Sequence, residues 1–363
     1  MAKNILQLTG MNSTKYGGLE QYFVELVRAC PDYRFSFLFE SKPKNEKYVD
    51  ELLSGGARLF FQSTSDSRKY ISYVSNIIVQ EKIDIVHFHF APIRISPLLK
   101  IRFPRVTFIA TIHLLYYPTS FKGKIMNKLS FLPFKRILCV SEGAKQSLIN
   151  YVGKSRKYQV LYLGVKPNPV INEKLKKDLQ IPQETVVLTS IGFSIRVKGL
   201  DVLLESIKNI VARKRLKHEI KVLIVGVEKN SEEDRLLNGL IIEKNLSDTV
   251  IPLGIRNDIQ DIMNITDVYI QASRTEALSL SIMEAMQHSV PVIGSNVGGV
   301  PEVVHDGENG FLFPKESIID LSDRIVELVN NDELRQSMGL KSKSLSSVFS
   351  IENSIREMIQ EYN

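Results

Sequence analysis

The chain has 363 residues and a net charge of +7, with 44% hydrophobic and 24% charged residues. That length suits two domains of ordinary size, and that composition excludes a disordered or a membrane-spanning protein. No apolar run approaches the ~20 residues of a spanning helix. The segment Met1–Gly10 lacks the apolar region and cleavage site of a signal peptide, so we expect a cytoplasmic protein.

The charge is divided unevenly between the two halves of the chain. Residues 1–166 contain 25 Lys and Arg against 11 Asp and Glu, a net charge of +14, so the total of +7 leaves −7 for the remainder. Between Asp84 and Glu142 there are nine Lys and Arg and no acidic residue. We expect this basic segment to attract polyanions or anionic lipid.

Short apolar runs alternate with amphipathic stretches along the first half. Strands are predicted at Asn4–Leu8, Phe35–Phe39, Ile83–Phe88, Thr107–Ile112 and Ile137–Val140. Helices are predicted at Leu19–Arg28, Tyr70–Gln80 and Glu142–Asn150, the last capped by Ser141. This alternation indicates a parallel sheet with helices on both faces.

The same alternation restarts after Leu163–Pro169, a segment whose glycine and prolines suit a linker. Strands are predicted at Val186–Ile191, Lys221–Val225, Val250–Leu253, Val268–Gln271 and Val292–Gly294. Helices are predicted at Leu200–Arg213, Glu232–Lys244, Leu278–Gln287 and Ser317–Asn330. We therefore expect an α/β protein of two Rossmann-like domains, residues 1–166 and 167–345, whose parallel sheets face each other across a cleft.

In each half of the chain, a glycine-containing turn follows the first predicted strand. Gly17 and Gly18 open a helix, where backbone N–H groups favour an anion, although a glycine pair alone is more often only a turn. The turn from Gly192 to Gly199 contains Arg196 and Lys198, two cations that can neutralise a diphosphate. A solvated basic loop is the alternative interpretation of the second turn.

Two glutamates eight residues apart, Glu276 and Glu284, flank the start of a predicted helix. At ~100° per residue they would point about 80° apart on one helix, so different roles are expected. Glu276 fits the loop before the helix and Glu284 its apolar body, where a carboxylate needs a polar partner. A glycine-rich turn, Val297–Glu302, follows the next strand.

In this order and spacing the motifs resemble those of the GT4 family of retaining glycosyltransferases, over essentially the whole chain. Weaker agreement comes from Asp84–His89, Thr111–His113, Val140–Glu142 and Asp306–Leu312. The resemblance implies the GT-B fold, an N-terminal acceptor domain and a C-terminal domain for the nucleotide-sugar donor, UDP more than GDP. It also implies that residues 346–363 form a helix returning to the N-terminal domain.

The resemblance also assigns roles to single residues. Glu276 would hold the donor sugar's hydroxyls, Glu284 the ribose and Lys198 the diphosphate, with His113 close to the sugar; Glu276, His113, Lys198 and Arg196 are therefore the catalytic candidates. Further donor contacts are implied at Gly17, Gly18, Gly192, Ile255, Ala277, Leu278, Ser279 and Leu280. His87 and His89 are interpreted as ordinary strand residues.

The sequence departs from the family pattern at a few positions. Phe193 stands where an arginine usually follows the first glycine of the phosphate loop, and Arg196 is the nearest substitute. Ala277 and Ser279 replace two glycines, and Leu163 precedes Gly164 where the family has asparagine. The resemblance implies transfer with retention, and because no convincing covalent nucleophile is present we expect attack from the front face of the sugar. No metal-ligand spacing is present either, so metal-independent transfer is expected, with no cofactor beyond the nucleotide sugar.

Part of the basic segment has a helical pattern of apolar residues. Phe121, Ile125, Leu129 and Leu132 recur at helical spacing. Lysines and an arginine lie among and beyond them: Lys122, Lys124, Lys128, Lys135 and Arg136. This combination favours a helix at the inner face of an anionic membrane and a glycan or lipid-linked acceptor, as in cell-surface polysaccharide or glycolipid synthesis. The alternative is that the stripe packs on the domain's own sheet.

Two other functions remain open from the sequence. A nucleotide-sugar 2-epimerase shares the two-domain architecture and would convert its donor without an acceptor. A nucleic-acid-binding protein would explain the basic first half, but the chain has neither zinc-ligand spacing nor an aromatic RNA-binding pattern, and the second half is acidic. Cys30 and Cys139 are expected to be reduced core thiols, and the oligomeric state is left open.

Overall fold

The structure is a computed structural model, which describes residues 3–10, 16–117, 120–167, 170, 172, 174–213 and 216–363, with the backbone alone at 121 and 122. It divides into two compact units. The first comprises Met1–Gly164 together with Ile351–Asn363, and the second comprises Val165–Ser350. Asn168 and Pro169 of the predicted linker lie outside the described residues.

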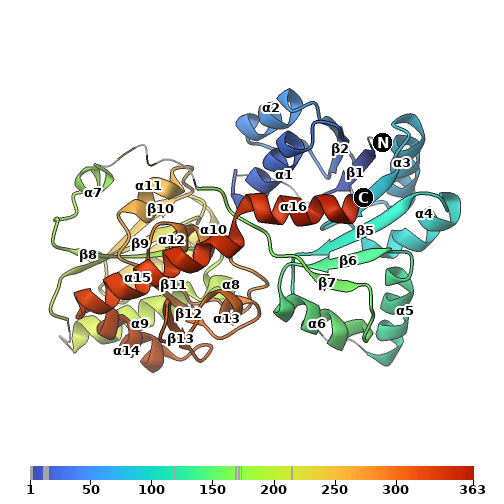
Figure 1. The fold of residues 1–363 in the computed structure, drawn as a ribbon. Helices are drawn as coiled ribbons and strands as arrows, with labels where there is room; N and C mark the ends of the chain where they lie inside the picture. Colours follow the sequence, from blue (N-terminus) through green and yellow to red (C-terminus); the bar gives the residue numbers. More distant parts are fainter. Residues whose placement is uncertain are drawn as a thin grey trace. The chain divides into compact units, whose positions relative to one another are not determined.

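The first unit is built on a parallel seven-stranded sheet (Figure 1). The strand order is β3-β2-β1-β4-β5-β6-β7, so the chain leaves β1 in one direction and resumes from β4 in the other. The strands are β1 (Asn4–Leu8), β2 (Arg34–Phe39), β3 (Arg58–Phe61), β4 (Ile85–Phe88), β5 (Thr107–Ile112), β6 (Arg136–Cys139) and β7 (Tyr158–Val160). In this register Gln7 lies opposite His87, which lies opposite Ile109.

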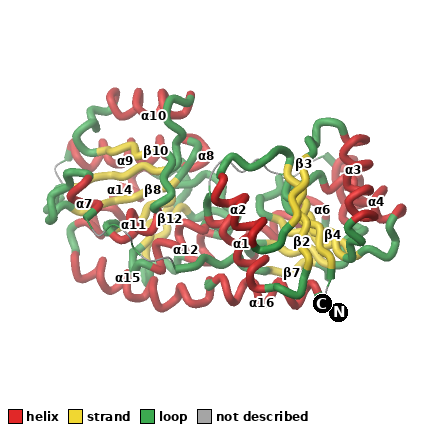
Figure 2. Tube along the Cα trace, turned by 90° about the horizontal axis from the view of Figure 1, so that it is seen from above, coloured by secondary structure: helices red, strands yellow, loops and turns green. Residues whose placement is uncertain are grey.

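Helices cover this sheet on both faces, as the separated yellow and red layers of Figure 2 show. They are α1 (Gly18–Ala29), α2 (Glu46–Ser54), α3 (Ser67–Gln80), α4 (Ser96–Arg102), α5 (Phe121–Phe131), α6 (Glu142–Val152) and the C-terminal α16 (Ile351–Tyr362). The short 3-10 turn η1 (Ile93–Ile95) leads into α4. Helix α16 packs beside α1, so the end of the chain completes the first unit (Figure 1).

The second unit has a parallel six-stranded sheet in the order β10-β9-β8-β11-β12-β13. Its strands are β8 (Val186–Ile191), β9 (Ile220–Val225), β10 (Val250–Gly254), β11 (Val268–Gln271), β12 (Val292–Ser295) and β13 (Gly310–Phe313). This order is that of a doubly wound nucleotide-binding sheet, in which the chain reverses direction between the two central strands. Here those strands are β8 and β11.

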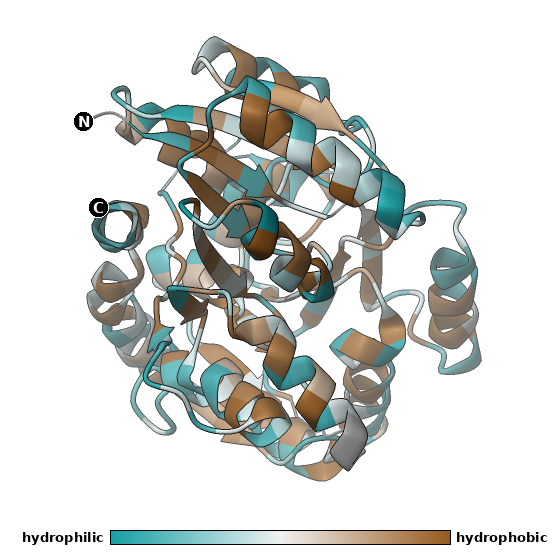
Figure 3. Cartoon of the chain, turned by 90° about the vertical axis from the view of Figure 1, so that its right-hand side faces the viewer, coloured by the Kyte–Doolittle hydropathy of each residue, from teal (hydrophilic) through white to brown (hydrophobic). Residues whose placement is uncertain are grey.

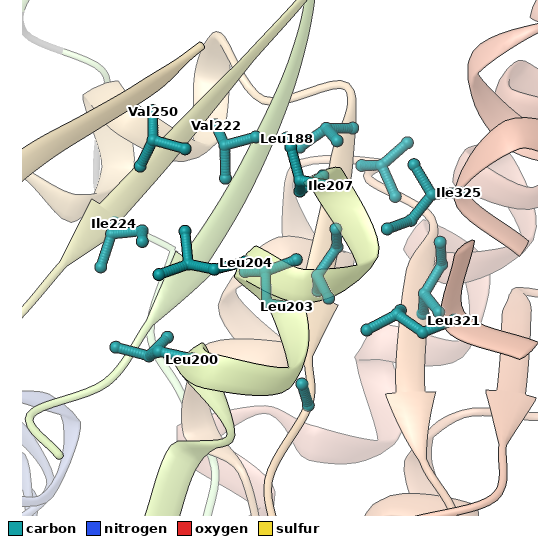
Figure 4. Close-up of a cluster of buried hydrophobic side chains, with 14 of the residues drawn as sticks. Leu188, Leu200, Leu203, Leu204, Ile207, Val222, Ile224, Val250, Leu321 and Ile325 are labelled. Atoms are coloured by element: carbon teal, nitrogen blue, oxygen red, sulfur yellow. The ribbon is translucent and has the colours of Figure 1, made fainter. Parts of the chain in front are cut away.

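The helices of the second unit bury one apolar side against this sheet. They are α7 (Leu175–Asp178), α8 (Ile195–Lys198), α9 (Leu200–Ala212), α10 (Glu232–Glu243), α11 (Ile259–Asn264), α12 (Leu280–Gln287), α13 (Val300–Val303), α14 (Ile318–Val329) and α15 (Asp332–Ser346), followed by the turn η2 (Ser347–Phe349). Figure 4 shows Leu203 and Ile207 of α9 pointing into the same cluster as Leu321 and Ile325 of α14. Strand residues such as Leu188 complete this core.

Most of the predicted elements are confirmed, with ends that shift by one to three residues. Ser141 caps α6 by accepting a hydrogen bond from the backbone N–H of Ala144, as its position predicted. The sequence interpretation missed β3, β7 and β13, which are four residues long or shorter. All three lie at an edge of their sheet, whereas the four-residue strands β4, β6, β11 and β12 that were predicted lie inside the sheets. In Figure 3 the strands are mostly brown, whereas the helices carry both colours.

Cys30 and Cys139 are buried free thiols, which confirms their interpretation as core residues. Burial raises the pKa of the Cys30 thiol to about 11 and that of Cys139 to about 12. In the part of the chain that the structure describes, no helix is long and apolar enough to span a bilayer.

Candidate active site

The candidate site of the second unit lies where β8 and β11 end side by side. Because the chain leaves these neighbouring strands in opposite directions, their following loops separate and leave room for a ligand beyond the sheet edge. The first loop runs from Gly192 into α8, and the second runs from Ala272 to Ser279. The predicted phosphate loop and the first predicted glutamate therefore belong to adjacent strand ends.

The loop after β8 is held in place at both ends of the short helix α8. Ser194 is its N-cap, and Glu233 of α10 accepts a hydrogen bond from the backbone N–H of Ile195 at 2.8 Å. Gly199 ends it with φ +64, and a Cβ there would lie 2.0 Å from the carbonyl oxygen of Ala272. Only glycine fits this close approach of the two loops.

Lys198 and Glu276 form an ion pair across these two loops. Nζ of Lys198 lies 2.6 Å from Oε2 of Glu276, and 17% and 10% of the two side chains are exposed. The aliphatic stem of Lys198 passes over Gly192, where a Cβ would come within 2.6 Å of it. The glycine therefore lets the lysine lie close to the backbone and reach the carboxylate.

A buried polar network supports the carboxylate of Glu276 from below. Its Oε2 also accepts hydrogen bonds from Nε2 of Gln271 at 3.1 Å and from Oγ of Ser273 at 3.3 Å. Oε1 of Gln271 accepts in turn from the hydroxyls of Tyr269 and Ser279, at 2.9 and 3.1 Å. Burial raises the pKa of Tyr269, so this hydroxyl remains a donor. The network fixes one oxygen of Glu276 in a single position.

A second ion-pair cluster fastens the same two loops outside the network. Arg274 makes a bidentate contact with Asp201 of α9, at 2.7 and 2.8 Å, and it also pairs with Glu316. Its guanidinium donates to the carbonyl oxygen of Arg196 at 2.8 Å. The side chains of Arg196 and Phe193 are exposed, at 58% for Phe193. The loop therefore presents two cations, Lys198 in an ion pair and Arg196 exposed.

The helix after the second loop begins where the sequence predicted. Ser279 is the N-cap of α12 and Leu280 its first residue, while Ala277 is buried and Leu278 half-buried in the loop. Because the Ser279 hydroxyl donates to Gln271, no side chain of the described residues caps the first turn of α12. Glu284 lies half-buried in the body of the helix. The two glutamates thus occupy different environments, as predicted.

Two further glycine-containing segments lie at the carboxyl ends of the strands of this sheet. The backbone N–H of Gly299, in the turn after β12, donates to the carbonyl oxygen of Glu276 at 3.1 Å. Ile255 follows β10 and is 39% exposed. Between them, Gly226 after β9 donates its backbone N–H to the carbonyl oxygen of Gly254.

In the first unit, the glycine pair after β1 has its own acidic partner. Gly17 is the N-cap of α1, and its backbone N–H donates to Oε2 of Glu20 at 3.1 Å. Glu20 is buried, so an internal carboxylate occupies the position at the helix start where an anion was expected. Gly18 is the first residue of α1.

His113 lies directly after β5 and lines a pocket of about 410 Å³ in the first unit. The pocket is lined mainly by apolar and aromatic side chains, among them Phe90, Tyr116, Phe131 and Tyr151. Its polar lining residues include Arg94 and Asn127. Phe90 stacks on the His113 ring at 4.7 Å, and Tyr116 packs on Tyr151. Burial lowers the pKa of His113 to about 3, so the ring is neutral at physiological pH.

The predicted basic and apolar face lies on α5, one wall of that pocket. Ile125, Met126, Leu129 and Leu132 are about half exposed or more, whereas Phe131 is buried. The alternative, in which the stripe packs on its own sheet, is therefore wrong for Ile125, Leu129 and Leu132. Helix α4 packs beside α5 and adds the exposed Leu98 and Ile101, the latter 80% exposed.

The basic residues of this region are not all arranged alike. Lys124, Lys128 and Lys135 are exposed, whereas Arg136 pairs with Glu361 of α16 at 3.5 Å. The side chain of Lys122 lies outside the described residues. Two exposed lysines and the apolar residues thus share α5, with Lys135 just beyond it.

Sequence reasoning missed several supporting residues: Tyr269, Gln271, Ser273, Arg274, Asp201 and Glu233. Gln271 had a detectable signal, because a polar residue in an otherwise apolar buried strand needs an internal partner. Glu233 and Asp201 carried none, since solvated helices are full of such acids. Among the described residues, no three His, Cys, Asp or Glu side chains are grouped so that they could hold a metal ion.

Comparison with known proteins agrees with this geometry. Residues 16–168 match the family described as Glycosyltransferase Family 4, and residues 171–344 match the family described as Glycosyl transferases group 1. The chain belongs to the family 4 glycosyltransferases. The resemblance drawn from the motifs is therefore confirmed, and so is the α/β fold with two Rossmann-like parallel sheets.

Individual relatives of this glycosyltransferase cover most of its length. An uncharacterized glycosyltransferase of Methanocaldococcus jannaschii is 28% identical over 93% of this chain and 92% of its own. The N-acetyl-alpha-D-glucosaminyl L-malate synthase of Bacillus anthracis is 24% identical over 75% of this chain and 72% of its own. Anabaena HepE, solved with UDP-glucose, shares the fold, with a TM-score of 0.83, 18% identity and 99% of both chains covered.

Proposed function

We propose that this glycosyltransferase transfers a hexose from a nucleotide-diphosphate sugar, UDP-linked rather than GDP-linked, with retention of anomeric configuration. The observation that carries the proposal is the Lys198–Glu276 pair between the carboxyl ends of β8 and β11. It places a cation and a carboxylate, the groups needed for a diphosphate and for sugar hydroxyls, at the sheet position where nucleotides bind in doubly wound folds.

The donor's parts can be matched to groups at this edge. Lys198 and Arg196 would meet the diphosphate, together with the first-turn N–H groups of α12 at Ser279 and Leu280. Glu276 would bind sugar hydroxyls through Oε1, since Oε2 already accepts three hydrogen bonds. Glu284 would hold the ribose. Two similar proteins support this assignment: HepE was solved in complex with UDP-glucose, and the Bacillus relative is named an N-acetyl-alpha-D-glucosaminyl L-malate synthase.

Remaining donor contacts follow from their positions in the loops. Gly192 would let the diphosphate approach the backbone beside Lys198, and Ala277 and Leu278 would border the sugar. Ile255 would lie near the nucleoside. Gly17 and Gly18 are assigned to the phosphates by family resemblance, although the N–H of Gly17 is bonded to Glu20 here. A donor phosphate at Gly17 would have to replace that bond.

Retention would proceed without a covalent intermediate. Oε2 of Glu276 is held by Lys198, Gln271 and Ser273, and Oε1 is assigned to sugar hydroxyls, so neither oxygen of this carboxylate is assigned to attack the anomeric carbon. The bond between the anomeric carbon and the phosphate oxygen would break as the acceptor oxygen attacks from the same face. The acceptor proton would pass to the departing diphosphate. Lys198 and Arg196 would stabilise the charge that develops there without a metal ion.

The acceptor would bind to the first unit, with its reacting hydroxyl near His113. We propose a glycan or lipid-linked acceptor at the inner face of an anionic membrane, in polysaccharide or glycolipid synthesis. The exposed apolar residues of α4 and α5 lie beside lysines, and an apolar face bordered by basic residues suits a headgroup layer. No part of the proposal requires nucleic acid.

A panel of nucleotide sugars tests the donor assignment. A ligand at 100 times its dissociation constant adds about 2.7 kcal/mol to the free energy of unfolding, so the correct donor should raise the melting temperature above the others. We expect a UDP-sugar to do so, and its transfer to proceed in excess EDTA. Stabilisation only by GDP-sugars, loss of transfer on chelation, or conversion of the donor without acceptor would each contradict a part of the proposal.

A further inference from the structure

Six polar side chains form a continuous buried chain of hydrogen bonds in the first unit. They come from three neighbouring strands, the residues just after them, and the C-terminal helix: Gln7, His87, His89, Thr111, His113 and Tyr362. Five of the six are buried, and His113 is half-buried at the pocket. A polar row inside an apolar sheet is costly unless every member has a partner, so its presence calls for an explanation.

The chain runs from the pocket to the last helix and back into the sheet. Nε2 of His113 lies 2.9 Å from Nδ1 of His89, whose Nε2 lies 2.7 Å from Oε1 of Gln7. Nε2 of Gln7 donates to the hydroxyl of Tyr362 at 2.8 Å. That hydroxyl lies 2.7 Å from Nδ1 of His87, whose Nε2 lies 2.8 Å from Oγ1 of Thr111.

The amide of Gln7 gives the chain one direction. Its oxygen can only accept, so Nε2 of His89 carries a proton and Nδ1 of His89, in the neutral ring, is an acceptor. His113 must then donate to it from Nε2. At the amide nitrogen of Gln7, the hydroxyl oxygen of Tyr362 accepts a hydrogen bond. The hydroxyl hydrogen of Tyr362 is then donated to Nδ1 of His87. All three histidines are therefore expected in the same tautomer, protonated at Nε2.

The burial of the histidines keeps this pattern from being lost by protonation. Burial lowers the pKa of His87 to about 3, and the nearby His113 lowers it further. Burial and its histidine neighbours hold the pKa of His89 well below the ordinary value. Neutral rings have one donor and one acceptor each, so the order of donors along the chain is retained across physiological pH.

Nδ1 of His113 is the atom left over by this arrangement. No hydrogen bond to it is present among the described residues, and the ring lines the 410 Å³ pocket. His113 is already assigned to the sugar by the family resemblance, and we propose that Gln7 and Tyr362 are positioning residues that keep its Nδ1 unprotonated, as a hydrogen-bond acceptor for a sugar hydroxyl. The ligand class is thus a hydroxyl donor rather than an anion. The sugar identity of this ligand rests on the proposed function, whereas the tautomer does not.

The C-terminal helix gains a role in the site from this assignment. Tyr362 lies on α16, in the last turn of the chain, and its backbone oxygen is bonded to Lys3 while Tyr33 bonds to Asn363. Loss of the Tyr362 hydroxyl would leave the Gln7 amide without its acceptor and Nδ1 of His87 without its donor. The amide could then turn, and the preference of His113 for one tautomer would weaken.

Nitrogen NMR of the free protein tests the proposal without any substrate. With six histidines in the chain, ¹⁵N-histidine labelling and the single variants His87→Gln, His89→Gln and His113→Gln allow these three rings to be assigned. We expect protonated Nε2 and unprotonated Nδ1 in His87, His89 and His113 at pH 7. A proton on Nδ1 of His113, or a charged ring there, would overturn the proposal, whether or not a donor sugar has been found.

Tyr362→Phe then tests the positioning role. We expect mixed tautomers at His113 and a fall in kcat on the order of tenfold with KM nearly unchanged, as for one lost positioning hydrogen bond. Tyr70→Phe is the matched control, because the Tyr70 hydroxyl is also buried but has no hydrogen-bond partner among the described residues. Unchanged His113 resonances and kcat in folded Tyr362→Phe, or equal changes in Tyr70→Phe, would refute the role.

Discussion

Nζ of Lys198 lies 2.6 Å from Oε2 of Glu276. Lys198 lies in the loop region after β8 and Glu276 in the loop after β11, the two central strands of one sheet. The pair is mostly buried, and its carboxylate has two further donors in Gln271 and Ser273. Such a pair is stable only with its additional hydrogen bonds, and removal of either partner leaves a charge without compensation. The site is therefore already ordered before a donor binds.

Lys198→Ala should lower turnover by about 10²-fold or more, because one preorganised charge at the leaving group is lost. The measurement is kcat with the donor found in the nucleotide-sugar panel. Lys221→Ala is the control, since Lys221 lies near the opposite end of β9 and bonds to Asp248. Equal rates for the two variants would show that Lys198 does not act on the leaving group.

Gly199→Ala should lower the free energy of unfolding by roughly 2–4 kcal/mol, because φ is +64 and the new Cβ meets the Ala272 carbonyl. Gly239→Ala in α10 is the matched substitution. It has open space around the new methyl group and should be neutral or stabilising by up to about 1 kcal/mol. Urea unfolding compares them, and similar midpoints would mean that the loops do not approach as described.

Stability should fall as the pH drops from about 6.5. The native pKa values of His87 and His113 are about 3, below the ordinary value near 6.5, so between these pH values the unfolded chain binds more protons than the native one. In that range each of these histidines lowers the free energy of unfolding by up to ~1.4 kcal/mol for every unit that the pH falls. Urea midpoints at pH 7.5 and 5.5 measure this loss, which should shrink in His113→Gln and persist in the exposed His305→Gln. A pH-independent midpoint would contradict it.

Vesicle cosedimentation tests the membrane face of α4 and α5. Binding should rise with the anionic lipid content, fall with salt and weaken in Lys124→Glu/Lys128→Glu, since exposed charges are screened by ions. Lys208→Glu/Lys341→Glu makes the same change of charge on exposed residues of the second unit and should have little effect. Equal binding to neutral and anionic vesicles, or no binding, would favour a soluble acceptor.

The central strands and the positions of the two glutamates, one in the loop and one in the helix after it, were predictable because each depends on local signals. An apolar run such as Val186–Ile191, a glycine turn and a helix start are read from adjacent residues. The support of Glu276 depends on Gln271 and Lys198, and that of His113 depends on Gln7 and Tyr362. Tyr362 is 249 positions from His113 in the sequence and carries no local signal, so only the folded chain reveals this relation.

Calorimetric titration of UDP into the wild-type protein and Glu284→Gln tests the central claim most directly, because it asks whether the nucleotide binds at this end of the second sheet. If the Glu284 carboxylate holds the ribose hydroxyls, its change to an amide should raise the dissociation constant of UDP by about tenfold or more. This is the equivalent of one strong hydrogen bond. Glu243→Gln, an exposed glutamate at the end of α10, should bind UDP like the wild type. Equal affinity in all three proteins, or no binding of UDP to any of them, would contradict the donor site described here.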